Sequence, residues 1–299
     1  MSNYHISVLL NECIEALQIK ENGVYVDVTY GGGGHSKAIL EKLGPKGRLI
    51  AFDQDTDAKQ NLIDDPRISF VHANFKYLQR FLKLLKIEKV DGILADLGVS
   101  SYQFDTGERG FSYRFDGPLD MRMNTQDNVD ATQIINEYSE AELQNMLSNY
   151  GEVTNAKTLA QAIIQARSRQ KIDTIQGLLA VIEPNVRGNK ASYLAQVFQA
   201  IRIEVNDELN VLKAFLEQSA QVLHKDGRLV VISFHSLEDK LVKQYMKRGT
   251  FNDSHEKDEF GNIYLPFKTV QKKAIEASKD ELMKNRRSHS AKLRVATKL

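Results

Sequence analysis

Short apolar runs alternate with amphipathic stretches through the first third of the chain. The runs, rich in β-branched and aromatic residues, are Val24–Val28, Arg48–Asp53, Ile68–His72 and Val90–Asp96. Each has the length and composition of a buried strand. Apolar residues at helical spacing follow the first run, and a basic amphipathic stretch, Lys76–Lys86, follows the third. Strands that alternate with helices in this way predict an α/β fold with a parallel, doubly wound sheet.

The middle of the chain has a different pattern. Residues Gly98–Met123 are polar, aromatic and rich in glycine without a clear period, and they predict a long ordered loop. From 130 to 186 the apolar spacing is helical, and Ser139–Glu142 is a capping box that marks the start of one helix. Helical spacing continues to residue 223, and no strand pattern interrupts it.

Strand character returns at Arg228–Phe234. The simplest account is one α/β domain that is interrupted and then resumed. We place its two parts at residues 1–104 and 206–299, with an all-helical insert at residues 105–205. A chain of 299 residues is long enough for two such cores.

Four consecutive glycines follow the first predicted strand, within Asp27–Ser36, and a predicted helix begins directly after them. Strand, glycines and helix form a turn that lets a ligand lie against bare backbone. Two acids, Asp53 and Asp96, end the second and fourth strands. In a doubly wound sheet the carboxyl ends of the strands meet where ligands bind, so we expect these residues to be neighbours.

Three ligands compete for the glycine turn. A dinucleotide would require G-x-G-x-x-G, and here His35 and Ser36 follow the fourth glycine. A P-loop would place its lysine and hydroxyl residue at another spacing. S-adenosylmethionine (SAM) fits best, with Asp27 before the glycines and Asp53 on the ribose, because one carboxylate accepts hydrogen bonds from two neighbouring hydroxyls. A turn without any ligand is disfavoured by the acids that end the following strands.

Longer motifs carry a specific resemblance that runs nearly from end to end of the chain. They are His5–Glu12, Thr29–Ser36, Asp91–Ser101, Arg109–Met123, Phe198–Asn206, Gly227–Asp239 and Arg287–Arg294. Together they resemble the bacterial 16S rRNA (cytosine-N4)-methyltransferases. Three positions depart from the family pattern: Tyr30 stands where Phe is usual, Ser7 where Pro is usual and His289 where Arg is usual.

The resemblance implies a Rossmann-like class I SAM-dependent methyltransferase domain and a helical insert that recognises the substrate. It also implies a set of SAM-binding residues: Gly33, Gly34, His35, Asp53, Phe75, Asp96 and Gln103. The expected substrate is a cytosine in the decoding centre of 16S rRNA, in the assembled small ribosomal subunit. SAM is the expected methyl donor, no metal is expected, and a homodimer is left open.

Methylation of an exocyclic amine requires a hydrogen-bond acceptor on its N–H, because the nitrogen lone pair is delocalised into the ring. Asp96 is our candidate for this catalytic acceptor, with service to SAM alone as the alternative. His235 ends the last clear strand and is a second catalytic candidate. The alternative interpretation of this segment is a helix N-terminus capped by Ser236, three residues before Asp239.

The net charge is only +1, yet basic residues gather toward the end of the chain. Residues 240–299 hold 15 Lys and Arg against 7 Asp and Glu. A cluster suited to phosphates, and hence to RNA, follows: Arg286, Arg287, Lys292 and Arg294. An ordinary solvated surface explains the charge excess equally well when this feature is taken alone.

Composition narrows the remaining possibilities. Cys13 is the only cysteine, which excludes an intrachain disulfide, and its apolar surroundings indicate packing. No apolar run reaches membrane-spanning length and no signal peptide is evident, so we expect a cytoplasmic protein without a membrane partner. The alternatives to a methyltransferase are a SAM-binding ribosome-assembly factor whose methylation is dispensable, and a nucleotide oxidoreductase.

Overall fold

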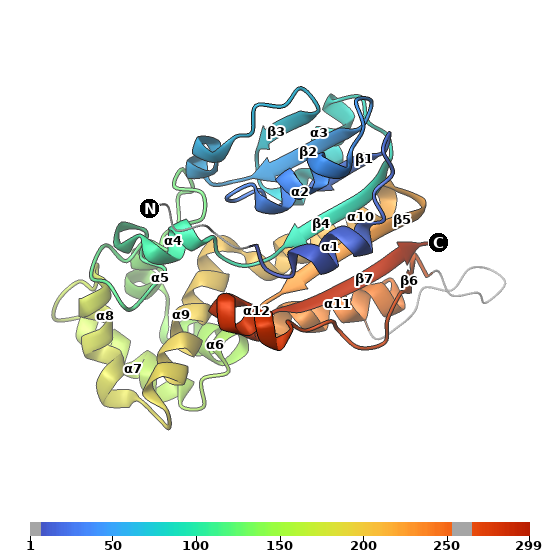
Figure 1. Cartoon of the computed structure of the whole chain (residues 1–299). Coiled ribbons are helices and arrows are strands. Elements are labelled where there is room, and N and C mark those ends of the chain that lie inside the picture. The colour runs from blue at the N-terminus through green and yellow to red at the C-terminus, as the bar shows by residue number, and fades with distance from the viewer. Residues whose placement is uncertain (1–6, 253–264) are drawn as a thin grey trace. The chain divides into compact units, whose positions relative to one another are not determined.

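The computed structural model describes residues 7–252 and 265–299 (Figure 1). The chain divides into two compact units: unit 1 comprises Met1–Gly98 and Leu209–Leu299, and unit 2 comprises Val99–Glu208. The insert predicted at 105–205 lies inside unit 2. His5, the first residue of the first motif, lies outside the described residues.

Unit 1 is built on a seven-stranded sheet in the order β3-β2-β1-β4-β5-β7-β6. Its strands are β1 (Val24–Asp27), β2 (Arg48–Asp53), β3 (Ile68–His72), β4 (Val90–Asp96), β5 (Leu223–Ser233), β6 (Phe267–Thr269) and β7 (Lys292–Lys298). The first five strands are parallel, whereas β7 runs antiparallel to both of its neighbours. The predicted doubly wound α/β fold is confirmed, and β2, β3 and β4 have the predicted bounds. No sequence pattern predicted β6 or β7.

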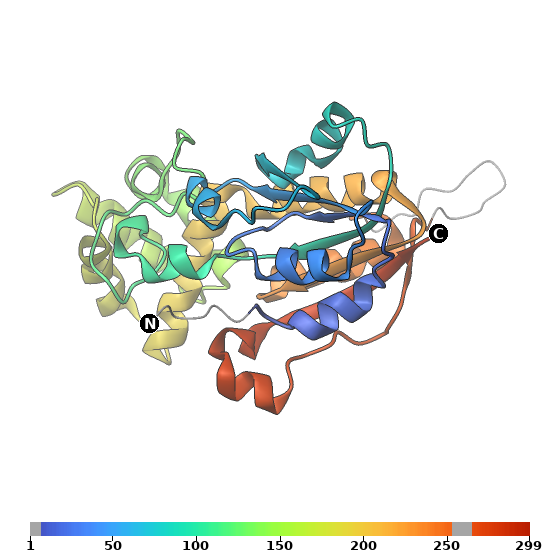
Figure 2. The same cartoon turned by 45° about the horizontal axis from the view of Figure 1, so that its top comes forward.

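Helices cover both faces of this sheet (Figures 1 and 2). They are α1 (Leu10–Leu17), α2 (Gly34–Lys42), α3 (Leu78–Leu84), α10 (Glu208–Val222), α11 (Ser236–Arg248) and α12 (Lys279–Lys284), with 3-10 helices η1 (Thr56–Asn61), η2 (Phe75–Tyr77) and η5 (Arg286–Ser290). Successive strand residues point to opposite faces. Val26 therefore packs with α3, α10 and α11, while Tyr25 packs with α1 and α2. Burial on both faces explains why the parallel strands are continuously apolar.

Unit 2 is a helical bundle with its own core. Its helices are α4 (Ser101–Asp105), α5 (Ala131–Glu137), α6 (Glu140–Gly151), α7 (Ala156–Arg167), α8 (Ile175–Ile182) and α9 (Lys190–Asn206), with 3-10 helices η3 (Gly107–Arg109) and η4 (Glu183–Asn185). The capping box predicted at Ser139 is present. The segment predicted as a loop, Gly98–Met123, contains α4 and η3 instead. A second capping box, formed by Ser100 and Gln103, starts α4. This capping box is visible in the sequence, but the segment has no helical periodicity to support it.

Hydrogen bonds from polar side chains hold the rest of the segment, up to Met123, in a defined conformation. The Arg109 guanidinium donates to the carbonyls of Arg122 and Met123, and Asn206 of α9 accepts from the Met123 amide at 2.7 Å. Asp120 accepts two hydrogen bonds from the Arg122 guanidinium and one from its amide.

None of the helices within the described ranges is both long and apolar enough to cross a membrane.

Candidate functional site

The glycine turn leads from β1 into α2 and has backbone angles that favour glycine. Gly31 has a φ of 52° and Gly33 a φ of 76°, in the left-handed region. A Cβ on Gly33 would also lie 2.8 Å from the Tyr30 hydroxyl, and one on Gly34 would collide with Ser7. No atom lies within 4 Å of a Cβ built on Gly32. The turn therefore presents bare backbone beside open space.

Tyr30 fastens this turn to the segment after η1. Its hydroxyl donates to the Asn61 carbonyl at 2.6 Å and accepts from the Ile63 amide at 3.1 Å. The Asn61 side chain in turn donates to the carbonyl of Gly31. Phenylalanine, the residue usual in the family that the motifs resemble, would make neither hydroxyl bond.

Asp27, at the end of β1, joins the two ends of the turn. Its carboxylate accepts from the Ser36 hydroxyl at 2.7 Å and from the Thr29 amide at 3.1 Å. The side chain is buried, and burial raises the pKa of Asp27. The Thr29 hydroxyl also accepts from the amide of Asp96 at 2.7 Å, which ties the turn to the end of β4. Asp27 thus positions the turn.

Asp53, at the end of β2, lies against the same turn. One carboxylate oxygen accepts from the Gly31 amide at 2.7 Å, and the other accepts from the Asp55 amide at 2.8 Å. Burial raises the pKa of Asp53 to about 6, although both hydrogen bonds act in the opposite direction. Each carboxylate oxygen can accept a second hydrogen bond, so Asp53 can still hold a pair of hydroxyls.

Asp96, at the end of β4, faces His35 from the start of α2. The His35 Nε2 lies 3.0 Å from the Val8 carbonyl, to which it donates in the neutral Nε2–H tautomer, and its Nδ1 lies 3.7 Å from Asp96 Oδ2. The other oxygen, Oδ1, is buried and has no hydrogen-bond partner in the described part of the chain. Burial is the main cause that raises the pKa of Asp96 to about 6; the nearby His35 acts in the opposite direction, and the charges of Asp27 and Glu238 act in the same direction as burial. A buried carboxylate oxygen without a partner is rare and indicates a place for a ligand.

His235 and Glu238 lie where β5 leads into α11. The N-cap of α11 is His235, without a side-chain cap bond, so the alternative prediction that Ser236 is the cap is wrong. His235 Nε2 lies 3.2 Å from Glu238 Oε1 without the alignment of a hydrogen bond, and neither ring nitrogen has a hydrogen-bond partner among residues 7–252 and 265–299. Glu238 Oε2 accepts from the Phe234 amide at 2.9 Å. The sequence alone does not mark Glu238 as a site residue, because acids are common in the first turn of any helix.

Phe75 and Gln103 complete the residues expected around SAM. Phe75 begins η2 just after β3, and its half-buried ring packs edge-to-face with that of Phe215, at a centroid distance of 5.3 Å. Gln103 is buried in unit 2, where its side chain accepts from the amide of Ser100. Gly33, Gly34, His35, Asp53, Phe75 and Asp96 thus belong to strand ends or following turns of unit 1, whereas Gln103 belongs to unit 2.

Of the four predicted phosphate-binding residues, Lys292 and Arg294 share a neighbour on α11, whereas Arg286 and Arg287 lie in η5. The Arg294 guanidinium, on β7, makes a bidentate ion pair with Asp239 of α11, at 2.5 and 2.9 Å, and both side chains are 13% exposed. Lys292 Nζ lies 3.8 Å from the same carboxylate. Arg286 is exposed and Arg287 half-buried in η5. Arg294 is therefore engaged inside the protein, which the sequence could not reveal because Asp239 is far away along the chain.

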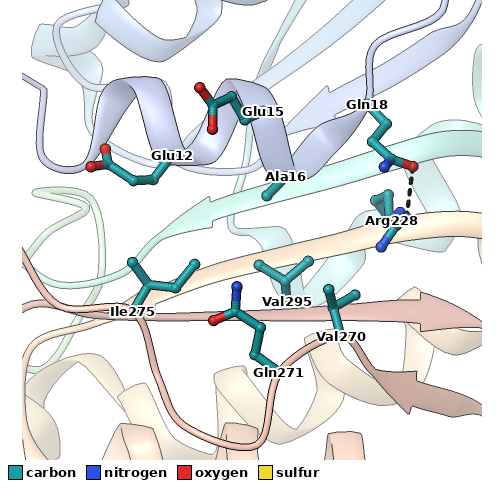
Figure 3. A pocket seen from close by; sticks show the side chains of 9 residues that line it. All are labelled: Glu12, Glu15, Ala16, Gln18, Arg228, Val270, Gln271, Ile275 and Val295. Atoms are coloured by element: carbon teal, nitrogen blue, oxygen red, sulfur yellow. Dashed lines mark hydrogen bonds between the residues drawn. The ribbon is translucent and has the colours of Figure 1, made fainter.

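A cavity of about 230 Å³ lies elsewhere in unit 1, beside α1 (Figure 3). Arg228 lines it and donates to the Gln18 side chain at 2.6 Å. Since Arg228 pairs with Gly92 near the start of β4, the cavity lies toward the amino ends of the parallel strands. None of the predicted site residues lines it.

Comparison with known proteins gives matches over nearly the whole chain. The model of the family described as the MraW methylase family matches residues 2–299. The ribosomal RNA small subunit methyltransferase H of Flavobacterium psychrophilum is 54% identical over 291 residues, which are 97% of this chain and 100% of the relative. The protein of the same name from Christiangramia forsetii is 51% identical over 300 residues, 100% of this chain and 99% of the relative.

A solved structure, an rRNA methylase from Streptococcus thermophilus, covers 97% of this chain and 93% of its own, with 11% identity and a TM-score of 0.41. The sheet of unit 1, with its acids and glycines at the carboxyl ends, confirms the predicted class I methyltransferase fold. Identity of about half over complete relatives confirms the resemblance that the motifs carry. This chain belongs to the MraW methylase family.

Proposed function

We propose that this chain transfers the methyl group of SAM to N4 of one cytosine in the decoding centre of 16S rRNA, within the small ribosomal subunit. The observation that carries the proposal is Asp96. Its buried Oδ1 has no hydrogen-bond partner among the described residues. Asp96 lies next to the glycine turn, as does Asp53 at the end of β2, and the chain belongs to a methylase family. Relatives named as small-subunit rRNA methyltransferases support the choice of substrate.

The residues of unit 1 fit SAM. The turn has open space at Gly32, directly before Gly33 and Gly34, so a ligand can approach the backbone near the start of α2. Asp53 offers a partly buried carboxylate to the two ribose hydroxyls. Phe75 offers an aromatic ring to the adenine, and His35 closes the turn. Gln103 remains a proposed SAM contact by resemblance.

The chemistry requires alignment and a proton acceptor. SAM supplies a methyl group that is already activated by a sulfonium sulfur. The protein must hold the amine nitrogen close to that carbon and opposite the sulfur. Asp96 accepts one N–H of the cytosine amine, which localises the nitrogen lone pair toward the methyl group. A base in structured RNA has to be unstacked to reach this position.

The remaining parts select the substrate. We propose that the helical insert, 105–205, recognises the RNA, and that Arg286, Arg287 and Lys292 contact phosphates. Arg294 supports them from the ion pair with Asp239. A substrate in the ribosomal subunit places the enzyme in the cytoplasm.

The test uses small subunits from a strain that lacks the enzyme, incubated with SAM labelled in its methyl group. Wild-type protein should transfer label to 16S rRNA, and Asp96→Ala should lose at least about 100-fold in rate while still binding subunits. Unlabelled rRNA, with subunit binding and growth unaffected by Asp96→Ala, would instead favour the SAM-binding assembly factor. Calorimetry with SAM and NADH separates both from an oxidoreductase.

A further inference from the structure

His235 is buried in a way that ordinary packing does not explain. Its side chain is 8% exposed, and both ring nitrogens are enclosed without a hydrogen-bond partner in the described ranges. Most buried polar atoms have hydrogen-bond partners, because a buried polar atom without one loses its hydration and gains nothing in return. A core histidine would be expected to satisfy at least one nitrogen, so His235 is arranged for a group that binds from outside the chain.

The Glu238 carboxylate lies next to the His235 imidazole. Its Oε2 is held by the Phe234 amide, which fixes the carboxylate directly beside the residue preceding the histidine. Its Oε1 lies 3.2 Å from His235 Nε2, which is within hydrogen-bond distance, so Oε1 can accept from Nε2–H once the two groups are aligned. In that tautomer Nδ1 has a free lone pair, and the carboxylate stabilises the imidazolium that forms when Nδ1 takes a proton.

His235 and Asp96 follow neighbouring strands. Asp96 pairs with Ile232 across β4 and β5, and the Leu97 amide donates to the Ile232 carbonyl at 3.0 Å. A Cβ on Gly98 would lie 3.2 Å from the Phe234 ring. The two strand ends therefore remain packed together up to the residue before His235. Asp96 and His235 each hold a buried acceptor atom that has no hydrogen-bond partner among the described residues, and a cytosine amine has two N–H groups to donate.

We propose that His235 is a second catalytic acceptor on the target amine, and that Glu238 is its positioning residue. Asp96 accepts one N–H and His235 the other. The N4–carbon bond forms as the carbon–sulfur bond breaks, and the nitrogen becomes positively charged. One of its two protons then passes to His235, which leaves N4-methylcytosine and S-adenosylhomocysteine. This inference rests on the proposed function.

The test measures single-turnover methylation of small subunits by His235→Ala, with and without added imidazole. The rate should fall at least about 100-fold, with SAM affinity by calorimetry changed less than about twofold. Imidazole should restore the rate at least about tenfold, because it refills the space with the missing base. His224→Ala, at an exposed histidine on β5, is the matched control and should show neither effect.

Glu238→Gln keeps an oxygen for the Phe234 amide and should lower the rate about tenfold, again at unchanged SAM affinity. Circular dichroism identifies a variant that has failed to fold, and His235→Asn then replaces His235→Ala. A rate within about threefold of wild type, or a loss that imidazole does not restore, overturns the inference. If wild-type protein places no methyl group on N4, the proposed function fails instead.

Discussion

Three carboxylates end parallel strands of unit 1: Asp27, which is buried, and Asp53 and Asp96, which are partly buried, and desolvation raises the pKa of each. Ionised carboxylates in such places destabilise the folded chain, and they persist where function requires them. Asp53 and Asp96 could be predicted because a strand followed by an acid is visible in sequence. Glu238 could not, since its partners, the Phe234 amide and the His235 ring, depend on how α11 begins.

The first prediction concerns stability and Asp96. Its folded pKa of about 6 exceeds the ordinary value of 3.8, so the folded state binds more protons between these values and loses stability as pH rises through them. Asp96→Asn should therefore be more stable than wild type at pH 7.5, by about 1–3 kcal/mol. Below pH 4 the difference should vanish. Urea unfolding at both pH values measures it, and a less stable variant at pH 7.5 would contradict the pKa.

The second prediction concerns Asp53 and SAM. Asp53→Asn keeps an acceptor for the Gly31 amide but removes the charge offered to the ribose. SAM affinity by calorimetry should weaken by about 1.5–3 kcal/mol, the scale of hydrogen bonds to a charged group. Asp64→Asn, at an exposed acid after η1, is the control and should bind SAM as wild type does. Equal affinity for all three proteins would remove Asp53 from the site.

Among the elements, the parallel strands were the easiest to predict and β7 the hardest. Short runs rich in β-branched and aromatic residues predict β2, β3 and β4 with the observed bounds, although β3 is only partly buried. In contrast, β7 lies near the sheet edge and alternates Lys292 and Arg294 with apolar residues. Its basic residues indicated a phosphate-binding cluster instead of a strand, because the sequence does not show that Arg294 pairs with Asp239.

The third prediction concerns the connection of β7 to α11. Arg294→Ala leaves the Asp239 carboxylate, itself 13% exposed, without its bidentate partner and should cost about 3 kcal/mol of unfolding free energy. Lys292→Ala should cost less than about 1 kcal/mol, because the Lys292 side chain is 44% exposed and its Nζ lies 3.8 Å from the Asp239 carboxylate. A double-mutant cycle with Asp239→Ala isolates the Arg294 pair. Equal, small losses for both variants would show that the ion pair does not stabilise the sheet.

At the scale of the whole molecule, the chain divides into two units with separate cores. Unit 1 carries the strand ends and the turn that we propose to hold SAM, and unit 2 carries the helices that we propose to recognise the RNA. In the sequence, the change from strand to helical periodicity indicates two such parts, because each core imposes its own spacing of apolar residues. The path of the RNA could not be predicted, since phosphate contacts need only exposed charge, wherever the fold places it.

The fourth prediction concerns that charge. If Arg286 contacts a phosphate, Arg286→Ala should weaken subunit binding and reduce the slope of log affinity against log salt by about 0.9. Arg48→Ala, at an exposed arginine that begins β2, removes the same charge at the amino end of a strand and should leave the slope unchanged. Identical slopes for wild type and Arg286→Ala would exclude Arg286 from the RNA contacts.

The most direct test of the central claim is the chemical position of the transferred methyl group. Small subunits from a strain lacking the enzyme are incubated with wild-type protein and methyl-labelled SAM, and the 16S rRNA is digested and analysed by nucleoside mass spectrometry. We predict label in N4-methylcytidine, from one decoding-centre position, and none with Asp96→Ala. Label on a ring carbon, on a 2′-oxygen or on another base would contradict the account.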